Sequence, residues 1–154
     1  MIKCGGGDDG LYEDRKFQQN IQGALANGIQ VGVYFYSGAS NAREAYDEAS
    51  YCISLIRDYQ ITYPVAFDWE LDGDYDSVTE ACETFCNVIS SYGYQPMVYS
   101  NRNRWYNNFD GEKIASKYKV WMAAYFGKFY YDSVRWTYGD ELPNFRYHYD
   151  MWQY

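Results

Sequence analysis

Hydrophobic positions recur at two different spacings along this 154-residue chain. In some segments apolar residues return every three or four positions, which is typical of helices, whereas others are short β-branched and aromatic runs typical of strands. Gly28 and Gly93 each follow a helical segment and are its stop signal. The pattern predicts helices over 17–25, 41–59, 77–92 and 110–117, and strands over 1–4, 29–36, 64–69, 96–100, 120–125 and 145–154.

The alternation of strands and helices indicates βαβ units around a parallel sheet. We therefore expect an α/β fold. The length of the chain and the lack of a linker, repeat or low-complexity segment favour one domain over residues 1–154. Parallel strands carry functional residues at their carboxyl ends. Tyr36, Tyr99 and Tyr125 each lie at or near the end of a predicted strand.

Two carboxylates, Asp68 and Glu70, close the predicted strand over 64–69. Since side chains two apart on a strand point the same way, both acids should leave the sheet on one side. Acids at the end of a buried strand are costly unless they are paired or carry out chemistry. Most enzymes that hydrolyse a glycosidic bond use a pair of carboxylates. The structural alternative is a salt-bridged pair.

Two helix starts have the spacing of a capping box, Asn41 with Glu44 and Ser77 with Glu80. In such a box the first side chain accepts a hydrogen bond from the backbone three residues on, and the acid reaches back to the first residue. We therefore expect helices to begin at these two positions.

Composition and charge narrow the range of partners. A net charge of −8 argues against nucleic acid, which requires a basic face, and gives no long-range attraction to an anionic wall polymer. There is no apolar run of about 18 residues, so no membrane partner is expected, and the amino-terminal segment is not a signal peptide. The 20 tyrosines offer flat faces that suit sugar rings, although most can equally fill strands and half-buried surface.

The cysteines and the single histidine favour structural roles. Cys4, Cys52, Cys82 and Cys86 match no zinc spacing, and two residues four apart on a helix rarely form a disulfide. Cys52 and Cys82 are expected to be small core residues. His148 lies in an aromatic strand, where a structural role is more typical than catalysis.

One acidic segment has an alternative interpretation as a calcium loop. Asp72, Asp74, Asp76 and Glu83 fall at positions 1, 3, 5 and 12 of such a loop. Position 6 is Ser77 rather than glycine, and a strand rather than a helix precedes the segment. An acidic loop before a helix amino terminus explains the same residues, so no metal site is predicted.

Five segments of the chain form an ordered set of motifs. They read Gly-Val-Tyr-Phe-Tyr at 32–36, Pro-Val-Ala-Phe-Asp-Trp-Glu at 64–70, Tyr-Gln-Pro-Met-Val-Tyr-Ser-Asn at 94–101, Val-Trp-Met-Ala-Ala-Tyr at 120–125 and Met-Trp-Gln-Tyr at 151–154. With this set the chain resembles, over essentially its whole length, a glycoside hydrolase family 25 lysozyme, an N-acetylmuramidase. The resemblance implies an irregular TIM-like β/α barrel of five β/α units followed by three strands.

The resemblance also implies an activity, the hydrolysis of the β-1,4 bond between N-acetylmuramic acid and N-acetylglucosamine in peptidoglycan. Asp68 and Glu70 match the family's catalytic Asp-x-Glu. We expect Glu70 to protonate the leaving oxygen, with its pKa raised by Trp69, the surrounding tyrosines and the charge of Asp68. Asp68 should stay ionised and either stabilise positive charge or orient the substrate's N-acetyl group. No cofactor is expected.

Four aromatic residues match positions around the family's sugar site, Tyr36, Tyr99, Tyr125 and Trp152. For the three tyrosines the alternative is packing at the barrel rim. For Trp152 the alternative is a terminal side chain that covers the core.

The chain departs from the family at both ends. The family's first strand, with a further active-site aspartate, would precede Met1, and another acidic residue would follow Tyr154, so a truncated barrel is expected. The competing function is therefore a weakly active or inactive domain that only binds glycan. Exposed strand edges should be covered by a rearranged terminus or by a second copy in a homo-oligomer. The expected partner is cell-wall peptidoglycan, and the expected site of action is extracellular or at the wall.

Overall fold

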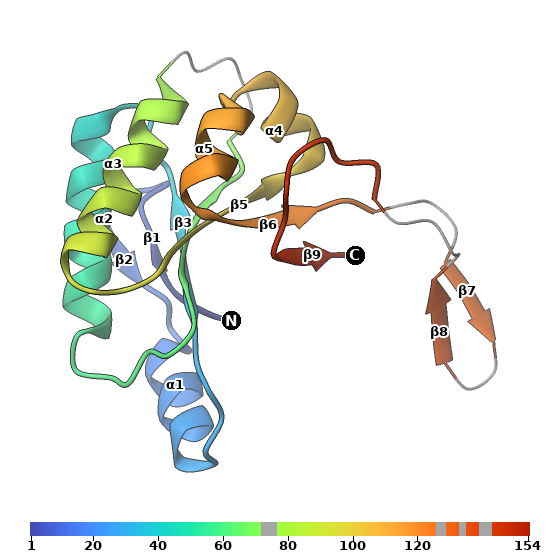
Figure 1. The fold of residues 1–154 in the computed structure, drawn as a ribbon. Coiled ribbons are helices and arrows are strands. Elements are labelled where there is room, and N and C mark those ends of the chain that lie inside the picture. Colours follow the sequence, from blue (N-terminus) through green and yellow to red (C-terminus); the bar gives the residue numbers. More distant parts are fainter. Residues whose placement is uncertain (72–76, 126–128, 133–134, 139–142) are drawn as a thin grey trace.

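The structure is a computed structural model and describes residues 1–71, 77–125, 129–132, 135–138 and 143–154 (Figure 1). Seven strands form one sheet in the order β2-β1-β3-β4-β5-β6-β9, and β7 pairs with β8 in a separate antiparallel ribbon. The strands are β1 (Ile2–Gly6), β2 (Tyr12–Glu13), β3 (Val33–Ser37), β4 (Val65–Trp69), β5 (Pro96–Asn101), β6 (Lys119–Ala123), β7 (Phe129–Asp132), β8 (Arg135–Tyr138) and β9 (Met151–Gln153).

Helices connect most of the parallel strands. Helices α2 and α3 lie side by side along one face of the sheet, while α4 and α5 follow β5 (Figure 1). The helices are α1 (Phe17–Ala26), α2 (Ala42–Ile56), α3 (Val78–Ser91), α4 (Arg102–Asn107) and α5 (Gly111–Lys117). Among the described residues, no helix has both the length and the apolar character needed to cross a membrane.

The sheet is parallel from β1 through β9, as the alternating pattern predicts. The seven described strands do not close into a ring, which is consistent with an irregular barrel. The outer edge of β1 is covered by its own chain, because β2 folds back antiparallel to it and the Asp14 amide donates a hydrogen bond to the Cys4 carbonyl at 3.0 Å. On this side of the sheet, the short strand β2 therefore pairs with the carboxyl end of β1.

The hydrophobic core lies between the sheet and helices α2 and α3. Phe85 of α3 contacts Phe35 and Phe67 at ring-centroid distances of 6.2 and 5.1 Å, and all three are fully buried. Cys52 and Cys82 belong to this core as free thiols, as expected. The strands therefore have one face against the helices and one facing away from them.

The predicted capping boxes have different outcomes. The Asn41 side chain accepts from the Glu44 amide at 3.1 Å, while the Glu44 carboxylate reaches back to the Ser40 amide at 2.8 Å, one residue earlier than expected. At the second position α3 begins as expected, with Ser77 as its N-cap residue, but the capping box does not form. Ser77 makes no capping hydrogen bond, because its hydroxyl donates to the Ser40 carbonyl and so ties the start of α3 to the loop after β3.

Other regions also differ from the sequence prediction, among them β2, β7 and β8, which were not predicted. Helix α4 was not predicted, since its polar sequence lacks helical periodicity. It forms because Asn101 accepts a hydrogen bond from the Arg104 amide at 3.0 Å and Trp105 is fully buried. The strand predicted over 145–154 shortens to β9, and the preceding aromatic residues pack instead against Trp105, as the 5.8 Å ring contact of Phe145 shows.

Candidate active site

The strand register brings the acid pair and two tyrosines to one face of the sheet. Asp68 on β4 is the partner of Tyr36 on β3 and of Tyr99 on β5. Since register partners on parallel strands point to the same side, these three side chains share the face that is turned away from α2 and α3. Tyr99 continues the row to its own partner Trp121, whose ring is 4.6 Å away at an interplanar angle of 61°.

Glu70 follows the last residue of β4 and lies at the mouth of a cavity. It is half-buried, whereas Asp68 is only 5% exposed. The cavity has a volume of about 310 Å³, and Glu70, Tyr99 and Tyr125 line it together. The remaining lining residues are Asn101, Arg102, Asn103, Ala123 and Ala124. The structure thus gathers three of the predicted site residues around one hollow.

The protonation of Asp68 differs from the sequence expectation. Burial, followed by the charge of Glu70, raises the pKa of Asp68 to about 8 against the opposing charge of Lys3. Oδ1 of Asp68 has no hydrogen-bond partner within the described part of the chain, so no hydrogen bond to that atom offsets its desolvation. The expectation of an ionised Asp68 is therefore wrong for the free protein at neutral pH. The reason is that Asp68 lies within the sheet, whereas Glu70 lies beyond its end.

Tyr99 and Tyr36 are neutral hydrogen-bonding groups at the site. Burial, followed by the charges of Glu70 and Asp68, holds the pKa of Tyr99 well above its ordinary value. Burial and the charge of Glu70 raise the pKa of Tyr36 in the same way. Tyr125 is 59% exposed, and its hydroxyl accepts a hydrogen bond from Gln153 Nε2 at 2.8 Å. The site therefore offers both a buried and an exposed aromatic face beside Glu70.

Trp152 is placed apart from the other predicted residues. Its register partner is Met122, which is buried in the core, so its side chain leaves β9 on the helix-facing side. Its indole Nε1 donates to the Ala124 carbonyl at 3.1 Å. The structure therefore does not bring Trp152 to the acid pair, and the alternative in which it covers the core describes its position.

Several residues on the acid-bearing face were not identified from the sequence. They are Lys3, Tyr34, Asn101, Trp121 and Gln153, and each is placed there by strand register or by the cavity lining. Four of the five lie within the recognised motifs, and only Lys3 lies outside them. A motif does not show which side chains face Asp68, because that depends on the pairing of strands distant in sequence. The signal that could have found them is the alternation of side-chain direction along each strand, combined with the predicted parallel order of the strands.

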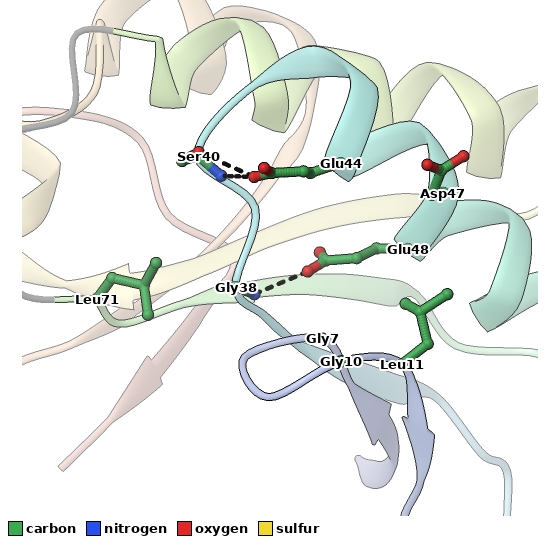
Figure 2. Close-up of a pocket in the computed structure, with 9 residues that line it drawn as sticks. All are labelled: Gly7, Gly10, Leu11, Gly38, Ser40, Glu44, Asp47, Glu48 and Leu71. Atoms are coloured by element: carbon green, nitrogen blue, oxygen red, sulfur yellow. Dashed lines mark hydrogen bonds between the residues drawn. The ribbon is translucent and has the colours of Figure 1, made fainter.

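A second hollow, of about 550 Å³, lies between the loops after β1 and β3 and helix α2 (Figure 2). Its most unusual group is Glu48, which is 3% exposed and accepts hydrogen bonds from Ser37 Oγ at 2.5 Å and the Gly38 amide at 2.8 Å. Burial raises the pKa of Glu48 to about 7, although both hydrogen bonds oppose the shift. None of the predicted site residues lines this hollow, so we place the candidate active site at Glu70.

The remaining sequence candidates lie elsewhere. The predicted calcium positions 72, 74 and 76 are outside the described residues, and Glu83 forms ion pairs with Lys113 and Lys117. The described residues contain no group of three or more histidine, cysteine, aspartate or glutamate side chains that could hold a metal ion. The His148 side chain is 77% exposed, with Nε2 3.7 Å from Asp150 Oδ1.

Comparison with known proteins gives a family and several relatives. The sequence model described as glycosyl hydrolases family 25 matches residues 1–154. The chain is 30% identical over 100 residues to a lysozyme of Streptococcus phage Cp-1, which covers 62% of this chain and 29% of that protein. It is 33% identical over 101 residues to a D-alanyl-L-alanine endopeptidase of Streptococcus phage B30, and this match covers 62% of this chain and 22% of that protein. The chain thus spans less than a third of either relative.

A solved structure with the same fold is the modular autolysin LytC from Streptococcus pneumoniae in complex with a synthetic peptidoglycan ligand. The TM-score is 0.71 and the sequence identity 26%, over 86% of this chain and 33% of that one. The match agrees with the α/β sheet and helices described above.

Proposed function

Because the chain belongs to glycosyl hydrolase family 25, we propose that it is a peptidoglycan hydrolase that cleaves the β-1,4 bond between N-acetylmuramic acid and N-acetylglucosamine. The observation that carries this proposal is the placement of Asp68 and Glu70 at the carboxyl end of β4, with Glu70 on a cavity that Tyr99 and Tyr125 also line. The peptidoglycan ligand of LytC supports the same class of substrate. In this proposal residues 1–154 act as one catalytic unit.

Glu70 is the general acid of the proposed reaction. It lines the cavity, so its carboxyl can reach the leaving oxygen of the glycosidic bond, whereas Asp68 is almost fully buried behind it. Proton transfer to that oxygen breaks the bond to the anomeric carbon of muramic acid and leaves oxocarbenium-like positive charge on the ring. Neighbouring carboxylates resist double ionisation, so the pair holds one proton at neutral pH.

Asp68 contributes the negative charge of the pair in the transition state. With its proton on Glu70, Asp68 either stabilises the developing positive charge or accepts a hydrogen bond from the substrate's N-acetyl group. Both roles need Asp68 ionised when the substrate is bound, which requires the proton to reside on Glu70.

The aromatic residues supply the binding surface for the glycan. Tyr99 and Tyr125 line the cavity, and Tyr36 lies on the same sheet face beside Asp68. Their faces suit the apolar side of a sugar ring, and their hydroxyls suit its polar edge. The proposed place of action is the bacterial cell wall. In the same proposal, two copies pair along exposed strand edges to form a homo-oligomer.

The experiment is clearing of a bacterial cell-wall suspension by the full chain and by two matched variants. Glu70→Gln keeps the shape of the side chain but has no proton to donate, so clearing should fall at least 100-fold. Glu112→Gln, on the exposed surface of α5, should clear like the wild type. Sedimentation with walls should show that Glu70→Gln still binds.

Two outcomes would contradict the proposed activity. Equal clearing by the wild type and Glu70→Gln would remove Glu70 from the mechanism. Binding to walls without clearing by the wild type would support the competing function, a domain that only binds glycan.

A further inference from the structure

Lys3 places a positive charge on the acid-bearing face of the sheet. It pairs with Tyr34 in the register of β1 and β3, so its side chain shares a face with Tyr34 and Tyr36. Its ammonium lies 4.8 Å from the centroid of the Tyr36 ring and 5.5 Å from that of Tyr12. Both distances are within the range of a cation–π contact. Two rings from different strands therefore hold the ammonium beside the site.

The position of Tyr36 connects this ammonium to Asp68. Tyr36 and Asp68 are register partners on adjacent strands, and adjacent strands are about 4.8 Å apart. A charge held over the Tyr36 ring is therefore one strand away from the Asp68 carboxyl. Asp68 is 5% exposed, so water screens this attraction much less than it would at the surface.

We propose that Lys3 is a positioning residue of the site, one that fixes the Tyr36 ring and stabilises the ionised form of Asp68, so that the proton of the acid pair passes to Glu70 when the substrate is bound. This inference rests on the proposed function, because the position of the proton matters only if Glu70 is the general acid. Lys3 acts through Asp68 and Tyr36 and has no role in bond cleavage itself. No recognised motif of the chain includes it.

The charges around Asp68 and Lys3 are consistent with this role. Burial and the charge of Glu70 raise the pKa of Asp68, and the charge of Lys3 lowers it. Burial acts to lower the pKa of Lys3, but a hydrogen bond with Tyr12 and the charge of that phenol raise it overall. Lys3 therefore stays positively charged while the acid pair titrates. The other groups that act on Lys3 or on Tyr36 are Asp8, Asp14 and Tyr34.

The first test is the pH dependence of wall clearing by Lys3→Met and Lys3→Arg. Loss of the positive charge favours the protonated forms of both acids, so both limbs of the kcat/KM profile should move to higher pH in Lys3→Met. A displacement of roughly half a pH unit to one pH unit is expected for charges at this separation. Lys3→Arg keeps the charge and should retain the wild-type profile. Lys16→Met, which removes an exposed lysine at the start of α1, is the matched control.

A second measurement separates this inference from the proposed function. The side-chain carboxyl carbon of Asp68 can be titrated by NMR in the wild type, in Lys3→Gln and in Lys3→Arg, without any activity. The titration midpoint should rise in Lys3→Gln and stay in place in Lys3→Arg. An unchanged midpoint in Lys3→Gln, or an equal rise in both variants, overturns the role of Lys3 whatever the enzyme does. If the wild type is inactive but the titration midpoint of Asp68 still rises in Lys3→Gln, the hydrolase proposal is overturned. The effect of Lys3 on the ionisation of Asp68 then still holds.

Discussion

Tyr99 lies directly beside Asp68 in the parallel register of β4 and β5, and both side chains are almost completely buried at 6% and 5% exposure. The pair places an ionisable carboxyl against an aromatic wall rather than in water. Glu70, two residues on, faces the cavity instead. Because the two acids at this strand end differ in exposure, the site has one buried carboxyl group and one that faces the cavity.

The burial of Asp68 should make stability depend on pH. Its pKa is raised to about 8 in the folded protein, so its contribution to stability is present in full below about pH 4 and is lost as the pH rises through 8. Each pKa unit corresponds to about 1.4 kcal/mol, so the free energy of unfolding should fall by about 3–5 kcal/mol relative to Asp68→Asn over this interval.

Urea unfolding of the wild type and Asp68→Asn at about pH 4 and pH 8 measures this difference. Asp68→Asn should be the more stable protein at the higher pH, because the amide avoids burying a charge. A pH-independent difference between the two proteins would show that Asp68 titrates normally in the fold.

Gly7 should be intolerant of a side chain because of Glu48. A Cβ on Gly7 would lie 2.1 Å from Glu48 Oε1, and Glu48 cannot withdraw without breaking its hydrogen bonds to Ser37 and Gly38. Gly7→Ala should therefore lower the free energy of unfolding by about 2 kcal/mol.

Gly23→Ala is the control for this substitution. Gly23 lies in α1 with open space around its Cα, so alanine should raise the free energy of unfolding by about 0.5–1 kcal/mol. Equal effects of the two substitutions in thermal unfolding would contradict the close approach of Glu48 to Gly7.

Substitutions of Trp152 and Tyr125 should have different effects, the first on protein stability and the second on glycan binding. Trp152 packs on the core and its indole donates to the Ala124 carbonyl, so Trp152→Ala should destabilise the protein by about 3 kcal/mol. Tyr125 is 59% exposed on the cavity, so Tyr125→Ala should leave the melting temperature nearly unchanged and raise KM for wall fragments several-fold. Trp152→Phe, tested by the same kinetics, should keep the wild-type KM. A raised KM with intact stability in Trp152→Phe would place the indole against the glycan.

The sequence predicted the parallel α/β order and the position of the acid pair because both depend on local patterns. The run 64–69 is apolar enough to be recognised as a buried strand, and Asp68 and Glu70 are spaced to leave it together. Trp152 was assigned by motif alone. Its orientation follows from the pairing of β9 with β6, a relationship between segments about thirty residues apart that no local pattern reveals.

The ionisation of Asp68 was inaccessible from the sequence for a similar reason. Spacing shows that two acids share a strand end, but their pKa values depend on how deeply each is buried and on which charges lie across the sheet. Lys3 acts on Asp68 from β1, across β3. That effect becomes visible only once the strand order is known.

Identifying the bond that is cut tests the proposed muramidase activity most directly. Purified peptidoglycan is digested with the wild type, Glu70→Gln and Glu112→Gln, the new reducing ends are converted to alcohols with borohydride, and the fragments are analysed by mass spectrometry. N-acetylmuramitol ends are expected with the wild type and Glu112→Gln, and none above background with Glu70→Gln. Reduced N-acetylglucosamine ends, cleaved peptides without new reducing ends, or full activity in Glu70→Gln would contradict the proposed activity.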